Sequence, residues 1–222
     1  GIKSKIELSK RVISQVMVLN SKKIILINPN ARFTQKDANA LIEHEIGVHM
    51  VTTQNSLKQN LKLFNLGLPV NTEAQEGLAI LSEYLSGNIT LKRLKKLALR
   101  VVAVDMMCNG ANFSETFNFL VGHHYVSVDD AYTIVTRVFR GGGLTKDYLY
   151  LSGFNKILKM WKSDIDLSPF LIGKTSIDFY DTISEMIQRG MISKPKYITK
   201  SILNPIEKKD TSIYEYILSG IN

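Results

Sequence analysis

The stretch that decides the fold is the hexapeptide from His44 to His49, which reads His-Glu-Ile-Gly-Val-His. Glu76 follows His49 by 27 residues, in the string Gln-Glu-Gly-Leu-Ala. Two histidines that bracket an acidic residue, with a further carboxylate on a following segment, are typical of zinc hydrolases. The pattern predicts one zinc ion bound by His44, His49 and Glu76. Glu45 is then the candidate base that takes a proton from a zinc-bound water.

The two histidines are one residue further apart than in the common H-E-x-x-H pattern. In a regular helix, residues four apart share a face, whereas residues five apart diverge by roughly 140°. Both imidazoles can reach one ion only if the helix bulges or unwinds between them. Gly47 lies inside that interval, and glycine tolerates such a distortion. We therefore predict a locally bulged helix near Gly47; a straight, regular helix there would contradict the site.

The segments before the hexapeptide predict a pair of strands and then a helix. Runs rich in β-branched residues cover residues 12–19 and 23–27, with a short turn between them. Thr34, with Asp37 three residues later, is a capping-box pattern that predicts the start of a helix. The helix should extend through His44 and so carry the first part of the hexapeptide.

The remainder of the chain is predicted to be mainly helical. Thr72 and Gln75 form a second capping pattern, so Glu76 is expected in the first turns of a helix over residues 73–85. Residues 54–69 are predicted to be a loop with one helical turn. Thr90 is expected to cap and start a helix over residues 90–107, and Ser127 one over residues 128–139. Further helices are expected at residues 114–120, 144–161 (with an interruption at Ser152-Gly153), 168–172 and 177–189. A short sheet followed by many helices predicts a mainly helical α+β fold with a zincin-like site.

We expect residues 1–222 to form one catalytic domain. Residues 1–30 would be its strand-rich N-terminal part, residues 31–192 a helical core with the zinc site, and residues 193–222 a basic C-terminal segment. The chain begins without Met and without a signal-peptide pattern. We therefore expect it to be part of a longer protein.

The composition restricts the partners. The chain has 28 Lys and Arg against 20 Asp and Glu, a net charge of +8, which favours acidic partners. It contains no nucleic-acid-binding motif and no run of about 20 apolar residues, so we expect neither a nucleic acid nor a membrane partner. The single cysteine, Cys108, excludes an internal disulfide and is typical of the reducing cytoplasm. Its apolar neighbours predict a buried core thiol.

A basic, glycine-rich segment contains Arg137, Arg140 and Lys146 around three consecutive glycines. Arginine binds carboxylates bidentately, and glycine lets the backbone approach a ligand closely. The segment is therefore a candidate clamp for the C-terminal carboxylate of a peptide. The structural alternative is a helix end whose basic residues match the helix dipole. Two alternatives also apply to His123 and His124 at another predicted helix end. These histidines either have an oxyanion role or interact with the helix dipole.

Three strings occur in an order that resembles one family. They are HEIGVH at residues 44–49, QEGLA at residues 75–79 and RGGGLTKD at residues 140–147. From about residue 30 to residue 192, the chain is similar to the bacterial QEGLA-motif proteins. The eukaryotic relatives of those proteins are the microtubule-associated tubulin-tyrosine carboxypeptidases.

This resemblance implies a zinc metallopeptidase with one zinc ion. His44, His49 and Glu76 match the family's ligands and Glu45 its catalytic residue, while Glu73 lies outside the matched string as a weaker substitute for Glu76. The eukaryotic members remove a C-terminal aromatic residue from an acidic tail, which implies a peptide or protein C-terminal tail as the partner. Our hypothesis is a zinc-dependent metallocarboxypeptidase. The alternatives are a metalloendopeptidase and a non-enzymatic regulatory or binding module that keeps a structural metal or none.

Overall fold

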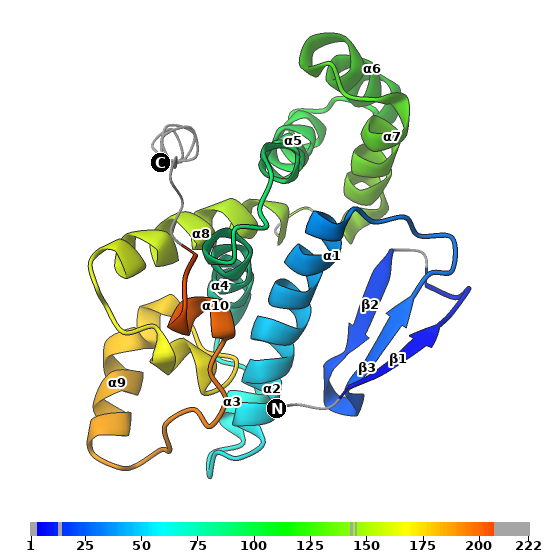
Figure 1. The fold of residues 1–222 in the computed structure, drawn as a ribbon. Coiled ribbons are helices and arrows are strands. Elements are labelled where there is room, and N and C mark those ends of the chain that lie inside the picture. Colours follow the sequence, from blue (N-terminus) through cyan, green and yellow to red (C-terminus); the bar gives the residue numbers. More distant parts are fainter. Residues whose placement is uncertain (1–3, 13–14, 143, 145, 207–222) are drawn as a thin grey trace.

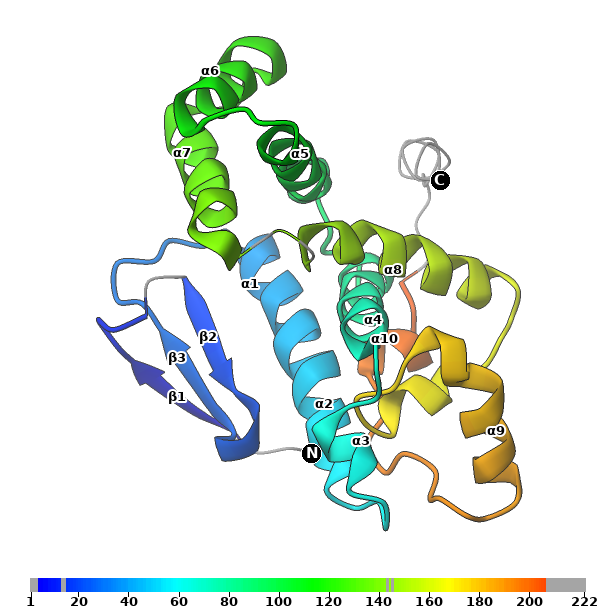
Figure 2. The same ribbon diagram turned by 180° about the vertical axis from the view of Figure 1, so that it is seen from behind.

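The computed structural model describes residues 4–12, 15–142, 144 and 146–206. It has the predicted architecture, a small N-terminal sheet followed by a mainly helical body (Figure 1). The sheet lies against one side of a long helix. Most of the helical body packs on the opposite side, and a group of three helices projects beyond the end of the long helix (Figures 1 and 2). No helix within the described residues is long and apolar enough to cross a lipid bilayer.

The sheet has three strands in the order β1-β3-β2, one more than the predicted pair. β2 (Val16–Leu19) and β3 (Ile24–Ile27) pair antiparallel, and the 3-10 turn η1 (Asn20–Lys22) joins them. β1 (Lys5–Leu8) pairs in parallel with β3. In β1 the apolar residues Ile6 and Leu8 alternate with charged ones, but the strand has only four residues and both apolar side chains are exposed. So short an alternation is a weak signal for a strand.

The helix predicted to start at Thr34 does so. The Thr34 hydroxyl accepts a hydrogen bond from the Asp37 amide at 3.1 Å, and the Asp37 carboxylate accepts one from the Thr34 amide at 3.2 Å. This capping box starts α1 (Gln35–Leu41), which continues without a break into the π-helix η2 (Ile42–Met50) and then α2 (Val51–Ser56). The three segments form one long rod beside the sheet (Figure 1).

The loop predicted over residues 54–69 begins later than expected, because the long helix extends to Ser56. Asn55 and Ser56 are residue types that favour loops, but both are buried here. The Asn55 side chain donates hydrogen bonds to the carbonyls of Leu171 at 2.7 Å and Tyr197 at 2.8 Å. These contacts from distant segments hold Asn55 in the helix. The predicted helical turn inside the loop is α3 (Leu63–Leu66).

α4 (Asn71–Leu85) is the central element of the helical body. It is buried throughout from its third residue onward, between the long helix and α8 (Lys146–Lys162). The predicted cap at Thr72 is wrong. The helix starts after Val70, which has a left-handed φ of 58° and makes no side-chain cap. The turn that starts α4 is therefore determined by the backbone rather than by a capping side chain.

Two glycines allow α4 and α8 to pack at backbone contact. A Cβ on Gly77 would overlap the backbone of Gly153, and a Cβ on Gly153 would overlap the carbonyl group of Glu73. The interruption predicted at Ser152-Gly153 is wrong, since α8 is continuous through both residues. The glycine serves close helix packing there rather than a helix end.

Gly153→Ala is expected to lower the free energy of unfolding by about 3 kcal/mol or more, the upper range for overpacking a core. The added methyl meets backbone atoms, which cannot rotate aside as a side chain can. Urea denaturation measures the effect. Gly122→Ala is the matched control, because a Cβ at Gly122 meets no atom within 4 Å and alanine favours a helix. Equal stability of the two variants would contradict the packing argument.

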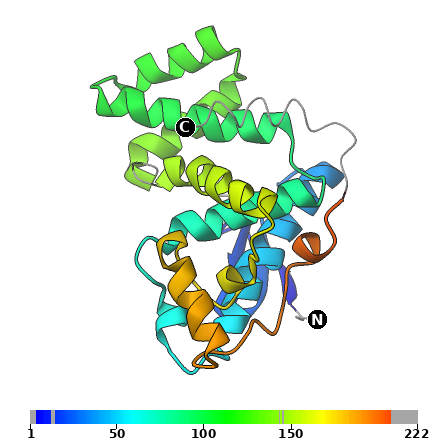
Figure 3. The ribbon, with the colours of Figure 1, turned by 90° about the vertical axis from the view of Figure 1, so that its left-hand side faces the viewer.

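Three helices form a group that projects from the body (Figures 1 and 3). α5 (Leu91–Cys108) starts at the predicted cap, where the Thr90 hydroxyl accepts a hydrogen bond from the Arg93 amide at 3.1 Å. α6 (Phe113–His124) and α7 (Val128–Arg137) follow and pack against α5 over a hydrophobic cluster of their own.

The predicted burial of Cys108 is wrong, because the thiol is exposed at the last residue of α5. Within the apolar run over residues 101–108, only Ala103 is buried. The helix turns one face toward α6 and α7, and Cys108 lies beyond the part that they cover.

The C-terminal third of the described chain packs on the helical body. Its elements are the 3-10 turns η4 (Ser168–Leu171) and η5 (Ile177–Phe179), α9 (Tyr180–Gln188) and α10 (Lys200–Leu203). The segment at α10 returns to the centre, where the Ser201 hydroxyl lies 2.7 Å from that of Ser82 in α4. The predicted basic segment over residues 193–222 therefore packs on the core as far as it is described. Residues 207–222 lie outside the described part of the chain.

Candidate metal centre

The predicted bulge between the two histidines is the π-helix η2 (Ile42–Met50). At its end the Val51 amide donates a hydrogen bond five residues back, to the Ile46 carbonyl, which is the wider hydrogen-bond pattern of a π-helix. The Gly47 carbonyl accepts a hydrogen bond from the Thr199 hydroxyl at 2.5 Å. A side chain from the C-terminal segment thus satisfies a carbonyl within the distorted turn.

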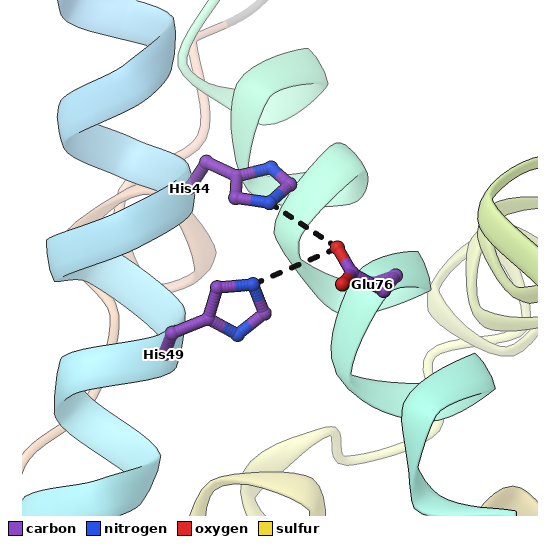
Figure 4. A group of neighbouring side chains, drawn as sticks. All are labelled: His44, His49 and Glu76. Carbon is purple, nitrogen blue, oxygen red and sulfur yellow. Dashed lines mark ion pairs between the residues drawn. The ribbon is translucent and has the colours of Figure 1, made fainter. Parts of the chain in front are cut away.

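The wider turn brings both imidazoles to the same side, facing Glu76 on α4 (Figure 4). Nε2 of His44 lies 3.3 Å from Oε2 of Glu76, and Nε2 of His49 lies 3.6 Å from the same oxygen. One ligand atom from each residue lies within 4.8 Å of the other two. In the described part of the chain, no other group of three His, Cys, Asp or Glu side chains has this arrangement.

These three residues fit a zinc ion. Ligands at about 2.0–2.2 Å from a tetrahedral zinc lie about 3.3–3.6 Å from one another, and both distances to Glu76 Oε2 match that spacing. Glu76 Oε2 is buried and has no hydrogen-bond partner among the described residues. Such an oxygen is costly in a protein interior. A cation between the three side chains would satisfy it.

The electrostatics of the metal-free chain keep Glu76 charged. Burial by itself would raise the pKa of Glu76, but the two imidazoles outweigh it and hold that pKa well below its usual range. Burial by itself would lower the pKa of His44, yet Glu76 and Glu83 raise it to about 9. Glu76 is therefore a carboxylate, the form that binds metal, and a metal ion bound at this site would displace a proton from His44.

Lys146, predicted as a substrate clamp, instead contacts the third candidate ligand. Its Nζ lies 3.1 Å from Oε1 of Glu76, the oxygen that points away from the imidazoles. With Oε1 paired to Lys146, Oε2 is the oxygen of Glu76 that would bind a metal. Two imidazoles and one carboxylate oxygen would leave a tetrahedral ion a fourth position for water or substrate.

A cleft of about 500 Å³ borders the candidate metal centre, and His44 and Glu45 line it together. More basic than acidic side chains line the cleft. The basic ones are Arg32, Lys92, Arg93, Lys96, Arg100 and Arg137, the acidic ones besides Glu45 are Asp37, Glu83 and Asp130, and Tyr150 also contributes to the wall. A smaller pocket of about 160 Å³ is lined by His49, Glu76 and Lys146. The candidate base and the candidate ligands therefore lie on the walls of open space.

The predicted clamp is only partly assembled at this cleft. Arg137 lines it and donates hydrogen bonds to both oxygens of the fully buried Asp147, at 2.8–3.1 Å. Arg140 is exposed in the π-turn η3 (Val138–Gly142) and does not line the cleft. Arg100, which was not predicted as a clamp residue, also lines the cleft and lies 3.9 Å from Asp147. Its Nε is buried and has no hydrogen-bond partner among the described residues.

Three other residues considered from the sequence lie away from the ligands. Glu73 is buried in α4 but binds Lys156 on α8 at 2.8 Å, so it is not placed to substitute for Glu76. His123 and His124 pack against the ring of Phe119 at the end of α6. Their position at the helix end agrees with the dipole contact rather than the oxyanion role.

The comparison with known families agrees with the site. The model of the family described as microtubule-associated tyrosine carboxypeptidase matches residues 1–219. This match includes the sheet, both helices with candidate ligands and the basic cleft. A search of curated protein sequences finds no significant match. With nearly its whole length matched, the chain belongs to the microtubule-associated tyrosine carboxypeptidase family.

Proposed function

We propose that the chain is a monozinc carboxypeptidase, with His44, His49 and Glu76 as ligands. One observation carries the proposal: Glu76 Oε2, which has no hydrogen-bond partner within the described part of the chain, faces two imidazoles at the spacing of zinc ligands, beside a cleft that contains Glu45. Zinc bound there would lower the pKa of a water ligand and polarise the substrate carbonyl. Membership of a carboxypeptidase family supports the same reaction.

Glu45 is the proposed general base. It follows His44 directly in the π-helix and lines the same cleft, so it is adjacent to the ligands without occupying a ligand position. Its carboxylate accepts the proton of the attacking water and passes that proton to the amine of the departing residue. Because Glu45 is half-buried rather than fully exposed, part of the bulk water is kept from the carboxylate.

Arg100 and Arg137 are the proposed anchors for the substrate's C-terminal carboxylate. The two guanidinium groups share one buried anion, Asp147. Arg137 donates hydrogen bonds to both oxygens of Asp147, whereas Arg100 lies 3.9 Å from it. Burial, together with the charges of Arg137 and Arg93, lowers the pKa of Arg100 to about 10. A second carboxylate in the cleft would compensate this excess of positive charge. Arg100 thus replaces Arg140 and Lys146 in the clamp.

We propose a peptide or protein tail as the substrate, with an aromatic C-terminal residue. The family's description specifies tyrosine, and the basic wall of the cleft suits an acidic chain before that residue. Zinc as the resident metal and a cytoplasmic location are parts of the same proposal.

A C-terminally diverse peptide library, with each peptide as free acid and as amide, tests the proposed function. Mass spectrometry should detect loss of one C-terminal residue from the free acids, no cleavage of the amides and no cleavage after chelation. Cleavage of amides at internal bonds would favour the metalloendopeptidase. Protein without stoichiometric zinc in elemental analysis would favour the binding module.

In the same assay, Arg100→Gln is expected to lower kcat/KM for free-acid peptides by about 10- to 100-fold, the effect of losing a hydrogen bond to a charged group. Arg140→Gln is the control, because Arg140 is exposed and outside the cleft, and it should stay within about threefold of the unmodified chain. If the two variants lose equal activity, Arg100 does not anchor the carboxylate.

A further inference from the structure

His44 has a second carboxylate neighbour, which the reaction described above does not use. Oε1 of Glu83 lies 2.8 Å from Nδ1 of His44, the ring nitrogen that faces away from Glu76. Glu83 is only 2% exposed. It lies seven residues after Glu76, two turns along α4 and on the same face. A single helix therefore approaches both nitrogens of one imidazole with carboxylates.

Arg93 holds Glu83 from the other side. Its Nε donates a hydrogen bond to Oε2 of Glu83 at 3.3 Å, and its Nη2 donates one to Oε1 at 3.2 Å. Arg93 lies in the first turn of α5, where its own amide is bound by the Thr90 hydroxyl. Both oxygens of Glu83 are thus engaged by a planar fork, which leaves the carboxylate little freedom to rotate away from His44.

The contact between Glu83 and His44 affects how the imidazole can bind a metal. A histidine binds metal through an unprotonated nitrogen, and the group bound at its other nitrogen selects the tautomer and the ring orientation. A carboxylate at Nδ1 accepts a hydrogen bond from the N–H there, which keeps the proton on Nδ1 and leaves the lone pair on Nε2, the nitrogen 3.3 Å from Glu76 Oε2. The same contact prevents the ring from turning about its side-chain bonds.

Glu73 shows that this contact differs from an ordinary buried ion pair of α4. Glu73 is 6% exposed and binds Lys156 of α8 at 2.8 Å, much as Glu83 binds Arg93 of α5. Glu73, however, contacts neither candidate histidine in the described structure. Both glutamates lie on α4, are buried and pair with a cationic side chain. Only Glu83 also contacts His44.

We propose that Glu83, held by Arg93, is a positioning residue that fixes the tautomer and orientation of His44 for metal binding. The inference rests on the proposed metal site. It assigns Glu83 no direct contact with metal or substrate. Its effect is therefore expected first in the affinity for zinc, and only through that in turnover.

Zinc affinity, measured by competition with a chromophoric chelator, tests the inference on the full 222-residue chain. Glu83→Gln is expected to weaken zinc binding by about 10- to 100-fold, the usual effect of losing a partner of a ligand. Glu73→Gln, the matched control, should remain within about threefold. Circular dichroism of both metal-free variants checks folding. If Glu83→Gln fails to fold, Arg93→Gln replaces it, with an expected loss of at least threefold.

The outcomes separate the inference from the proposed function. Unmodified protein that binds no zinc would overturn the metal site and the positioning role together. Zinc binding by the unmodified protein, with equal affinities for Glu83→Gln and Glu73→Gln, would overturn only the positioning role. If the replacement variant is used, unchanged affinity of Arg93→Gln would do the same.

Discussion

Glu45→Gln is expected to reduce kcat by about 10²- to 10⁴-fold, the usual contribution of a general base, while the protein keeps one zinc ion per chain. Glutamine preserves the shape of the side chain but cannot take a proton from the attacking water. Glu45 is not among the candidate ligands, so the metal site should stay intact. Peptide turnover measures the loss of kcat, and elemental analysis of the same sample measures the zinc content.

Glu43→Gln is the control for that variant. Glu43 lies in the same π-helix and next to His44, but its carboxylate contacts the Ser82 hydroxyl at 3.2 Å and does not line the cleft. Its turnover should stay within about threefold of the unmodified chain. Undiminished turnover by Glu45→Gln would exclude Glu45 as the base. Loss of zinc from that variant would instead identify Glu45 as part of the metal site.

His49→Ala is expected to lose stoichiometric zinc and, with it, more than about 10³-fold of the peptidase activity. Removing one of three ligands leaves an imidazole and a carboxylate, one fewer than the three protein ligands of a catalytic zinc site. His49 is a cleaner choice than His44, because His44 also contacts Glu83 and its loss would leave that buried carboxylate without one of its partners. Elemental analysis gives the zinc content directly.

Thermal unfolding provides a second measurement for His49→Ala. A metal that binds only the folded chain stabilises it, so a chelator should lower the Tm of the unmodified protein. The same chelator should leave the Tm of His49→Ala unchanged. His123→Ala, at an exposed position in α6, is the control and should respond to chelator as the unmodified chain does. A full zinc complement in His49→Ala would refute the ligand assignment.

Much of the architecture follows from local sequence. The caps at Thr34, Thr90 and Ser127 start α1, α5 and α7 as predicted, because a side chain that binds the amides of the first turn acts within a few residues. The π-helix between His44 and His49 was also predictable. Two ligands five residues apart can share an ion only if the helix turn widens, and the structure shows that wider turn.

Three predictions from local sequence were wrong because contacts with distant segments outweighed the local propensity of the residues. Asn55 remains helical because the carbonyls of two remote segments bind its side chain. Ser152-Gly153 continues a helix because α4 packs there at backbone contact. Cys108 is exposed because the partners of α5 cover only part of its apolar run. A local pattern contains no information about which surface another segment will cover.

The local sequence predicts the candidate ligands, the proposed base and the distorted helix that the ligand spacing requires. The surroundings of these residues depend on tertiary packing. That packing placed Glu83 on His44, assigned Lys146 to Glu76, and brought Arg100 into the cleft in place of Arg140. Ligand spacing is a constraint along one helix, whereas these contacts depend on how α4, α5 and α8 pack, which is settled by burial across the whole chain.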